Sequence, residues 1–119
     1  MEKRRFMRVH FKAKATVVSK ETTVEGEIEN LSLRGMYLQA CTQFKINEEV
    51  EVRISLPDVT PERALKTKAV AVRYREGGTG FEFAQMDFDS FFTLQDIIAR
   101  TSGAPGQVMM EVMKFVNQE

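Results

Sequence analysis

The chain has 119 residues, and its apolar share of 43% is enough for one domain with a hydrophobic core. Seventeen basic and seventeen acidic side chains cancel, so overall charge attracts neither nucleic acid nor anionic lipid, and any anion site must be local. No apolar segment approaches the roughly 20 residues of a membrane-spanning helix, so we expect a cytoplasmic protein without membrane insertion.

The amino-terminal residues concentrate the positive charge. Residues 1–9 contain one acid, Glu2, among several basic side chains, and we expect them to form a flexible basic arm. From Val9 to Val17 apolar and polar residues alternate, with His10 on the polar face, which predicts a half-buried strand. The basic residues of the arm and of this strand are Lys3, Arg4, Arg5, Arg8, Lys12 and Lys14.

The next segments predict three further strands. Residues 24–32 have the pattern of a second strand, and Gly35 turns the chain into a third strand over residues 36–40. These two strands are expected to pair as a hairpin. Apolar residues from Val50 to Leu56 then alternate strictly with polar ones, which is typical of a half-buried fourth strand.

Two more strands complete the predicted sheet. The fifth begins near Leu65, and its residues Val70, Val72 and Tyr74 share one face while Arg73 lies on the outward face. Arg73 is interpreted as a solvated charge, with a ligand contact as the alternative. Three glycines supply a turn into the sixth strand, which carries two phenylalanines: Gly77, Gly78, Gly80, Phe81 and Phe83.

The apolar spacing changes to a helical one after the sixth strand. Asp89 or Ser90 can cap a helix that ends at Gly103, with apolar residues at helical spacing. Residues 104–119 are expected to form a helical extension, with a second helix from Gln107 to Val116. Methionines broaden the apolar stripe of this second helix. We expect the stripe to pack on the barrel, with contact to a partner or a second copy as the alternative. The apolar residues are Phe91, Leu94, Ile97 and Ile98 in the first helix, and Val108, Met109, Met110, Val112, Met113, Phe115 and Val116 in the second.

Six short antiparallel strands followed by helices predict an all-β fold with one or two C-terminal helices. A closed six-stranded barrel over residues 9–101, including the first helix, removes the exposed edges that an open sheet would carry. Loops at the mouth of such a barrel are the expected ligand site.

Two motifs mark this site. Arg4 and Arg8 enclose an RxxxR pattern just before the first strand, and Asn30, Ser32 and Gly35 form an [D/N]xSxxG pattern at the end of the second. The combination resembles the PilZ domain family over residues 3–101. The later Gly-Phe-Glu-Phe segment, followed by a helix, is also similar to the last strand of that family. Position 30 is Asn where many members have Asp, and the amide oxygen accepts hydrogen bonds less strongly than a carboxylate does.

The side chains of the two motifs suit an anionic nucleotide. A planar guanidinium donates paired hydrogen bonds to phosphate or to guanine O6 and N7, and it can stack on a base. In an extended segment Arg4 and Arg8 point to the same side, while Arg5 points to the other and could reach a second ligand. Asn30 and Ser32 offer donors and acceptors on one strand face. Gly35 allows a positive φ and a close backbone approach. A plain serine turn is the structural alternative.

The resemblance implies a receptor for cyclic di-GMP. Arg4 and Arg8 are expected to clamp guanine and phosphate groups from the arm, with Arg5 as a further ligand-binding residue. Asn30, Ser32 and Gly35 are expected to receive the ligand on the barrel. Binding would fold the arm over the barrel and change the surface that an unidentified effector protein recognises. The protein is expected to be a monomer or a ligand-dependent homodimer.

The sequence argues against an enzyme, a cofactor or a metal site. Cys41 and His10 are far apart, and we interpret them as a small core or strand residue and a surface residue. Two alternatives to the receptor stay open: a protein-interaction adaptor of the same fold that binds no ligand, and a small-barrel nucleic-acid-binding module. The second is disfavoured because no aromatic ladder alternates with basic residues.

Overall fold

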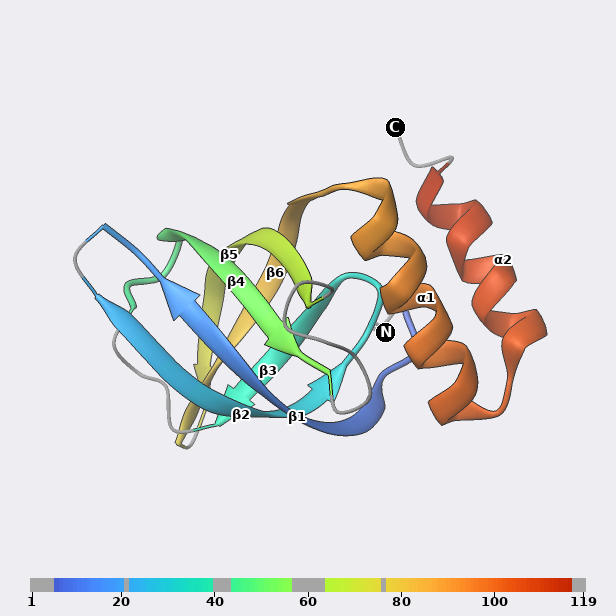
Figure 1. Ribbon diagram of the computed structural model, residues 1–119, viewed down its shortest axis with the longest axis horizontal. Coiled ribbons are helices and arrows are strands. Elements are labelled where there is room, and N and C mark those ends of the chain that lie inside the picture. Colours follow the sequence, from blue (N-terminus) through green and yellow to red (C-terminus); the bar gives the residue numbers. More distant parts are fainter. Residues whose placement is uncertain (1–5, 21, 40–43, 57–63, 76, 117–119) are drawn as a thin grey trace.

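The computed structural model describes residues 6–20, 22–39, 44–56, 64–75 and 77–116, with side chains described up to Lys114. Six strands form a closed barrel in which neighbours run antiparallel in the order β1-β2-β3-β6-β5-β4, and β4 pairs back onto β1. The predicted six-stranded antiparallel barrel is confirmed (Figure 1). The strands are β1 (Val9–Val18), β2 (Thr23–Leu31), β3 (Gly35–Gln39), β4 (Glu49–Ser55), β5 (Leu65–Arg75) and β6 (Gly78–Met86).

The alternation seen in the sequence is the alternation between barrel interior and exterior. Along β4 every second side chain is buried, and the same holds for the second half of β1. The two strands close the barrel by pairing Ala15 with Ile54 and Val17 with Val52, and all four side chains lie in the core. Burial of these residues drives closure, because it removes apolar surface from water and pairs both strand edges at once.

The face of β5 that carries Val70, Val72 and Tyr74 does not line the core. The buried side chains of β5 are Leu65, Thr67, Ala69 and Ala71 on the opposite face, while Val72 and Tyr74 are 37% and 49% exposed. The interior at this level is filled by Phe81 and Phe44, whose ring centroids lie 6.0 Å apart, so only small side chains fit beside them. The hydroxyl of Tyr74 instead donates a hydrogen bond to the carbonyl of Phe44.

Helix α1 (Phe88–Ser102) covers one end of the barrel (Figure 1). Its N-cap is Asp87 rather than the predicted Asp89 or Ser90: the backbone N–H of Ser90 donates to Asp87 Oδ1 at 2.8 Å. Ser90 is buried, and its hydroxyl accepts a hydrogen bond from the backbone N–H of Lys66 at 3.2 Å. Leu94 and other apolar residues face the core. The predicted end is confirmed, because Gly103 adopts the left-handed conformation with φ 69°.

Helix α2 (Pro105–Val116) packs beside α1 on the side away from the barrel (Figure 1). It begins two residues earlier than predicted, because proline at the first helical position costs no hydrogen bond. Its inner face buries Val108 and Glu111, whereas Met109, Met110 and Met113 are 49%, 64% and 59% exposed. The methionines therefore do not contribute to the core. Among the described residues, neither helix has the length and apolar character to cross a membrane.

Candidate functional site

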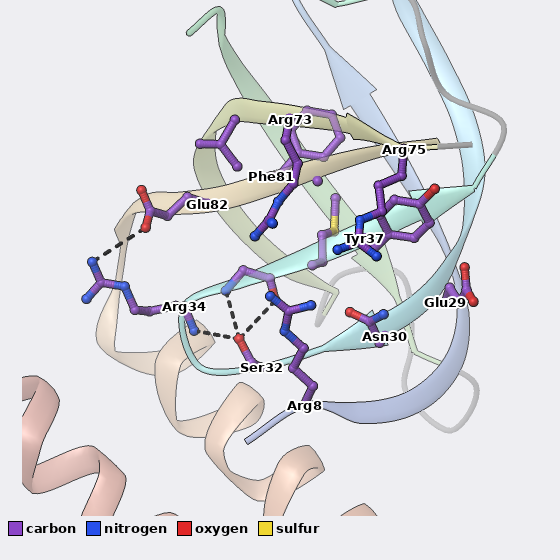
Figure 2. A pocket seen from close by; sticks show the side chains of 14 residues that line it. Arg8, Glu29, Asn30, Ser32, Arg34, Tyr37, Arg73, Arg75, Phe81 and Glu82 are labelled. Carbon is purple, nitrogen blue, oxygen red and sulfur yellow. Dashed lines mark hydrogen bonds and ion pairs between the residues drawn. The ribbon is translucent and has the colours of Figure 1, made fainter. Parts of the chain in front are cut away.

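A cavity of about 510 Å³ lies on the outside of the barrel, over β2, β3, β5 and β6 and beside the start of β1 (Figure 2). Four predicted site residues line it together: Arg8, Asn30, Ser32 and Gly35. The other two, Arg4 and Arg5, lie outside the described residues. The arm and the [D/N]xSxxG segment, far apart in sequence, thus meet at one place because β1 and β2 pair.

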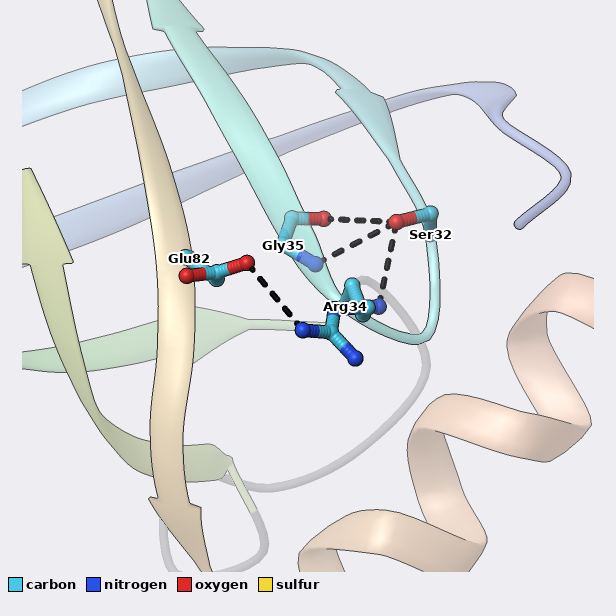
Figure 3. A network of polar contacts seen from close by, with 4 residues as sticks. All are labelled: Ser32, Arg34, Gly35 and Glu82. Carbon is cyan, nitrogen blue, oxygen red and sulfur yellow. Dashed lines mark hydrogen bonds and ion pairs between the residues drawn. The ribbon is translucent and has the colours of Figure 1, made fainter. Parts of the chain in front are cut away.

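The turn between β2 and β3 contributes Ser32, Arg34 and Gly35 to the lining of this cavity, and Figure 3 shows its polar contacts. Ser32 Oγ accepts hydrogen bonds from the backbone N–H groups of Arg34 at 3.1 Å and Gly35 at 3.2 Å. The backbone N–H of Ser32 donates to the carbonyl of Gly35 at 2.9 Å. The serine turn is therefore present, and it sets the shape of the motif. Ser32 is only 7% exposed, so this local role comes first.

Gly35 is needed for a reason other than the predicted positive φ, because the structure gives positive φ among glycines only at Gly77 and Gly103 of the described residues. A Cβ added at Gly35 would lie 2.1 Å from the carbonyl oxygen of Phe81 on β6. Glycine therefore allows β3 to approach β6 at the edge of the cavity. The requirement for glycine at this position of the motif is therefore steric, and its cause is tertiary.

Asn30 stands where the strand ladders are irregular. The pairing of β1 with β2 shifts register between His10 and Ala13, and that of β2 with β3 shifts between Ile28 and Asn30. Such shifts change the direction in which a side chain points. Asn30 is half-buried and its amide lies between Arg8 and Tyr37 (Figure 2).

The arm is described from Phe6 onward, and its last residues are packed against the protein. Phe6 and Val9 are 5% and 6% exposed and belong to the core cluster. The backbone N–H of Met7 donates to Glu111 Oε2 at 3.0 Å. Between these anchors Arg8 is exposed and its side chain extends into the cavity (Figure 2). Residues 6–9 are thus packed against the protein, whereas a flexible arm was expected over residues 1–9.

Arg34, which the sequence interpretation passed over, lines the same cavity. Its Nη2 lies 3.5 Å from Glu82 Oε2, and its guanidinium carbon lies 5.6 Å from the centroid of the Phe6 ring. The ion pair is exposed, so it contributes at most about 1 kcal/mol to stability. Its position inside the [D/N]xSxxG segment was the signal for it in the sequence.

The opposite wall carries two more arginines, Arg73 and Arg75 of β5. Arg73 pairs with Gly80 across the ladder, and a Cβ there would lie 3.3 Å from Arg73 Cγ, so the glycine makes room for this side chain. Arg8 and Arg73 point toward one another across the cavity (Figure 2). Arg73 is exposed, as expected of a solvated charge, and it also lines the cavity, whereas no motif in the sequence points to Arg75.

The cavity is electropositive although the chain is neutral overall. Four arginines line it against two acids, Glu29 and Glu82, and Tyr37 adds an aromatic ring. In the described part of the chain, no three His, Cys, Asp or Glu side chains come together in a way that could hold a metal. The arrangement can hold anionic groups and stack a planar base; the cavity lining includes no histidine or cysteine that could act as a general base or nucleophile.

Solved structures with the same fold are found at low sequence identity. The inhibitor of motility MotI/DgrA of Bacillus subtilis is 19% identical with a TM-score of 0.71, covering 87% of this chain and 54% of that one. The PilZ domain of Escherichia coli YcgR with c-di-GMP is 14% identical with a TM-score of 0.67, covering 85% and 92%. This chain therefore spans about half the length of the Bacillus subtilis protein.

No curated protein sequence matches the chain significantly. The family model of the PilZ domain matches residues 2–100, which include both sequence motifs, all six strands and most of α1. The chain belongs to the PilZ domain family.

Proposed function

We propose that this protein is a receptor domain for cyclic di-GMP that carries out no reaction of its own. The observation that supports this proposal best is the meeting of Arg8 with the Asn30–Gly35 turn in one electropositive cavity. YcgR of Escherichia coli, whose PilZ domain shares this fold, is known in complex with c-di-GMP.

The ligand has two phosphates and two guanines, and the cavity offers partners for both. The guanidinium groups of Arg8 and Arg73 face the same space and can donate paired hydrogen bonds to phosphate or to guanine O6 and N7. The Asn30 amide can complete the recognition of a guanine edge, and the Tyr37 ring can stack on a base.

In this proposal Arg4 and Arg5 add to the site from the part of the arm outside the described residues. Ligand binding folds that part over the barrel and changes the surface presented to an effector protein. The receptor acts in the cytoplasm, as a monomer or as a ligand-dependent homodimer.

Calorimetric titration of the wild-type protein with cyclic di-GMP tests the proposal, together with Arg8→Ala. We expect the wild type to bind and Arg8→Ala to lose at least about tenfold in affinity, because a charge-assisted contact is removed. Arg8 is exposed, so its loss should change the free energy of unfolding by no more than about 0.5 kcal/mol. Arg53→Ala is the matched control, since Arg53 is an exposed arginine on β4 outside this cavity.

Absence of binding by the wild type at physiological ionic strength would refute the receptor and favour the adaptor without a ligand. Salt-dependent binding to random oligonucleotides without a response to cyclic di-GMP would favour a nucleic-acid-binding module instead. The same titration reports the stoichiometry. A ratio of two ligands per protomer would support a stacked ligand dimer held by the arm.

A further inference from the structure

Helix α2 places a buried carboxylate against the arm. Glu111 is 7% exposed, and its Oε2 accepts the hydrogen bond of the Met7 backbone N–H at 3.0 Å, across 104 positions of sequence. Its other oxygen, Oε1, is buried with no hydrogen-bond partner among the described residues. Burial of a carboxylate with one partner is unfavourable, so packing alone does not account for this residue.

An apolar side chain would serve better if position 111 only fastened α2 to the protein. Val108, one turn earlier on the same face, is 1% exposed and does this without a desolvation cost. A glutamate three residues later differs from valine in one useful respect, which is that it can accept a hydrogen bond from the arm.

The Met7 backbone N–H that donates this hydrogen bond lies next to a residue of the candidate site. Met7 directly precedes Arg8, whose side chain lines the cavity, and directly follows Phe6, which is buried. The Phe6 ring in turn lies beneath the guanidinium of Arg34, at 5.6 Å from its centroid. The hydrogen bond from Met7 therefore fixes the backbone at the point where the arm leaves the core and enters the cavity.

We propose that Glu111 is a positioning residue for ligand binding, which acts through the Met7 backbone to hold Arg8 at the cavity. This inference rests on the proposed function. Helix α2 begins at Pro105, beyond the residues 2–100 that the family model matches, so Glu111 is not part of the two family motifs. The hydrogen bond between Met7 and Glu111 also links the arm to the helix that carries the exposed methionines Met109, Met110 and Met113.

The expected size of the effect follows from a population argument. When only a fraction of the molecules has the arm in the binding position, the apparent affinity falls by that fraction. Loss of one buried hydrogen bond to a charged group can reduce that population on the order of tenfold. The link is reciprocal, so bound ligand should also hold the arm more firmly against α2.

Two variants of the full chain test the inference, each measured without and with cyclic di-GMP. Glu111→Leu removes the acceptor and keeps an apolar side chain at the buried position, so thermal stability should stay the same or rise. We expect its Met7 amide to exchange hydrogen faster by NMR and its affinity to fall about tenfold. Glu111→Gln is the matched control, because its amide oxygen can still accept from Met7, and it should stay within about threefold of the wild type.

The outcomes separate this inference from the proposed function. If the wild type binds the ligand and Glu111→Leu binds equally well, the positioning role is refuted while the receptor stands. The role is also refuted if Met7 exchange is unchanged in Glu111→Leu, or if both variants lose affinity equally while the Met7 amide stays protected. A wild type that ignores cyclic di-GMP refutes the proposed function itself, and with it the ligand-binding role of Glu111.

Discussion

Gly35 shows how a single missing side chain determines the shape of the cavity. A Cβ at this position would lie only 2.1 Å from the carbonyl oxygen of Phe81, and the backbone N–H of Gly35 donates to Ser32 Oγ. The residue thus joins the close approach of β3 and β6 to the hydrogen-bonded turn. Neither contact can shift at low energetic cost, because the Phe81 carbonyl belongs to the strand that pairs with β3 and Ser32 is buried.

Gly35→Ala should therefore destabilise the protein by at least about 2 kcal/mol, because the added methyl group forces β3 away from β6. The free energy of unfolding in urea measures this. Gly106→Ala is the matched control: nothing lies within 4 Å of a Cβ there, and the residue is in the first turn of α2. It should leave stability unchanged or raise it by up to about 1 kcal/mol. Equal stability of the two variants would contradict the steric explanation.

At the scale of elements, the start of α1 depends on one carboxylate. The backbone N–H of Ser90, followed by its side chain, lowers the pKa of Asp87 from its ordinary value of 3.8 by hydrogen bonding to the charged form. A carboxyl whose pKa is lower in the folded state stabilises that state above its ordinary pKa, and the contribution disappears as pH falls through the folded value.

Asp87→Ala should accordingly lower the melting temperature at pH 7, and the difference from the wild type should shrink as the pH falls below 3.8. Thermal unfolding followed by circular dichroism between pH 2 and pH 7 (about the range in which carboxyl groups titrate) provides the measurement. Asp89→Ala serves as a control, since Asp89 lies in the first turn without being the N-cap, and should cost less. A difference that persisted unchanged into acid would exclude the Asp87 cap as its cause.

At the scale of the whole molecule, barrel and helices share one core. The cluster of buried residues runs from Ile54 of β4 through Leu94 and Ile98 of α1 to Val108 of α2. An apolar cluster that joins all these elements makes their unfolding interdependent, since no part can leave without exposing the others.

We therefore expect a single unfolding transition in urea. The chain has two tyrosines and no tryptophan, so tyrosine fluorescence reports on Tyr37 and Tyr74 of the barrel while far-ultraviolet circular dichroism includes the helices. The two signals should give the same midpoint, with a slope of about 1–3 kcal/mol/M. Loss of the helical signal at a lower urea concentration would show that α1 and α2 unfold separately.

The amino-acid sequence alone was enough to predict the barrel, the end of α1 at Gly103 and four residues that meet in the cavity: Arg8, Asn30, Ser32 and Gly35. These features depend on local quantities: the period of apolar residues, the conformational freedom of glycine and the spacing within a motif.

Only the three-dimensional fold reveals which face of β5 is buried and that Arg34, Arg73 and Arg75 join the site. The same holds for the bond between Met7 and Glu111. Each of these depends on residues far apart in the chain. Barrel closure, ladder register shifts and the packing of α2 bring them together, and none of these leaves a periodic trace in the sequence.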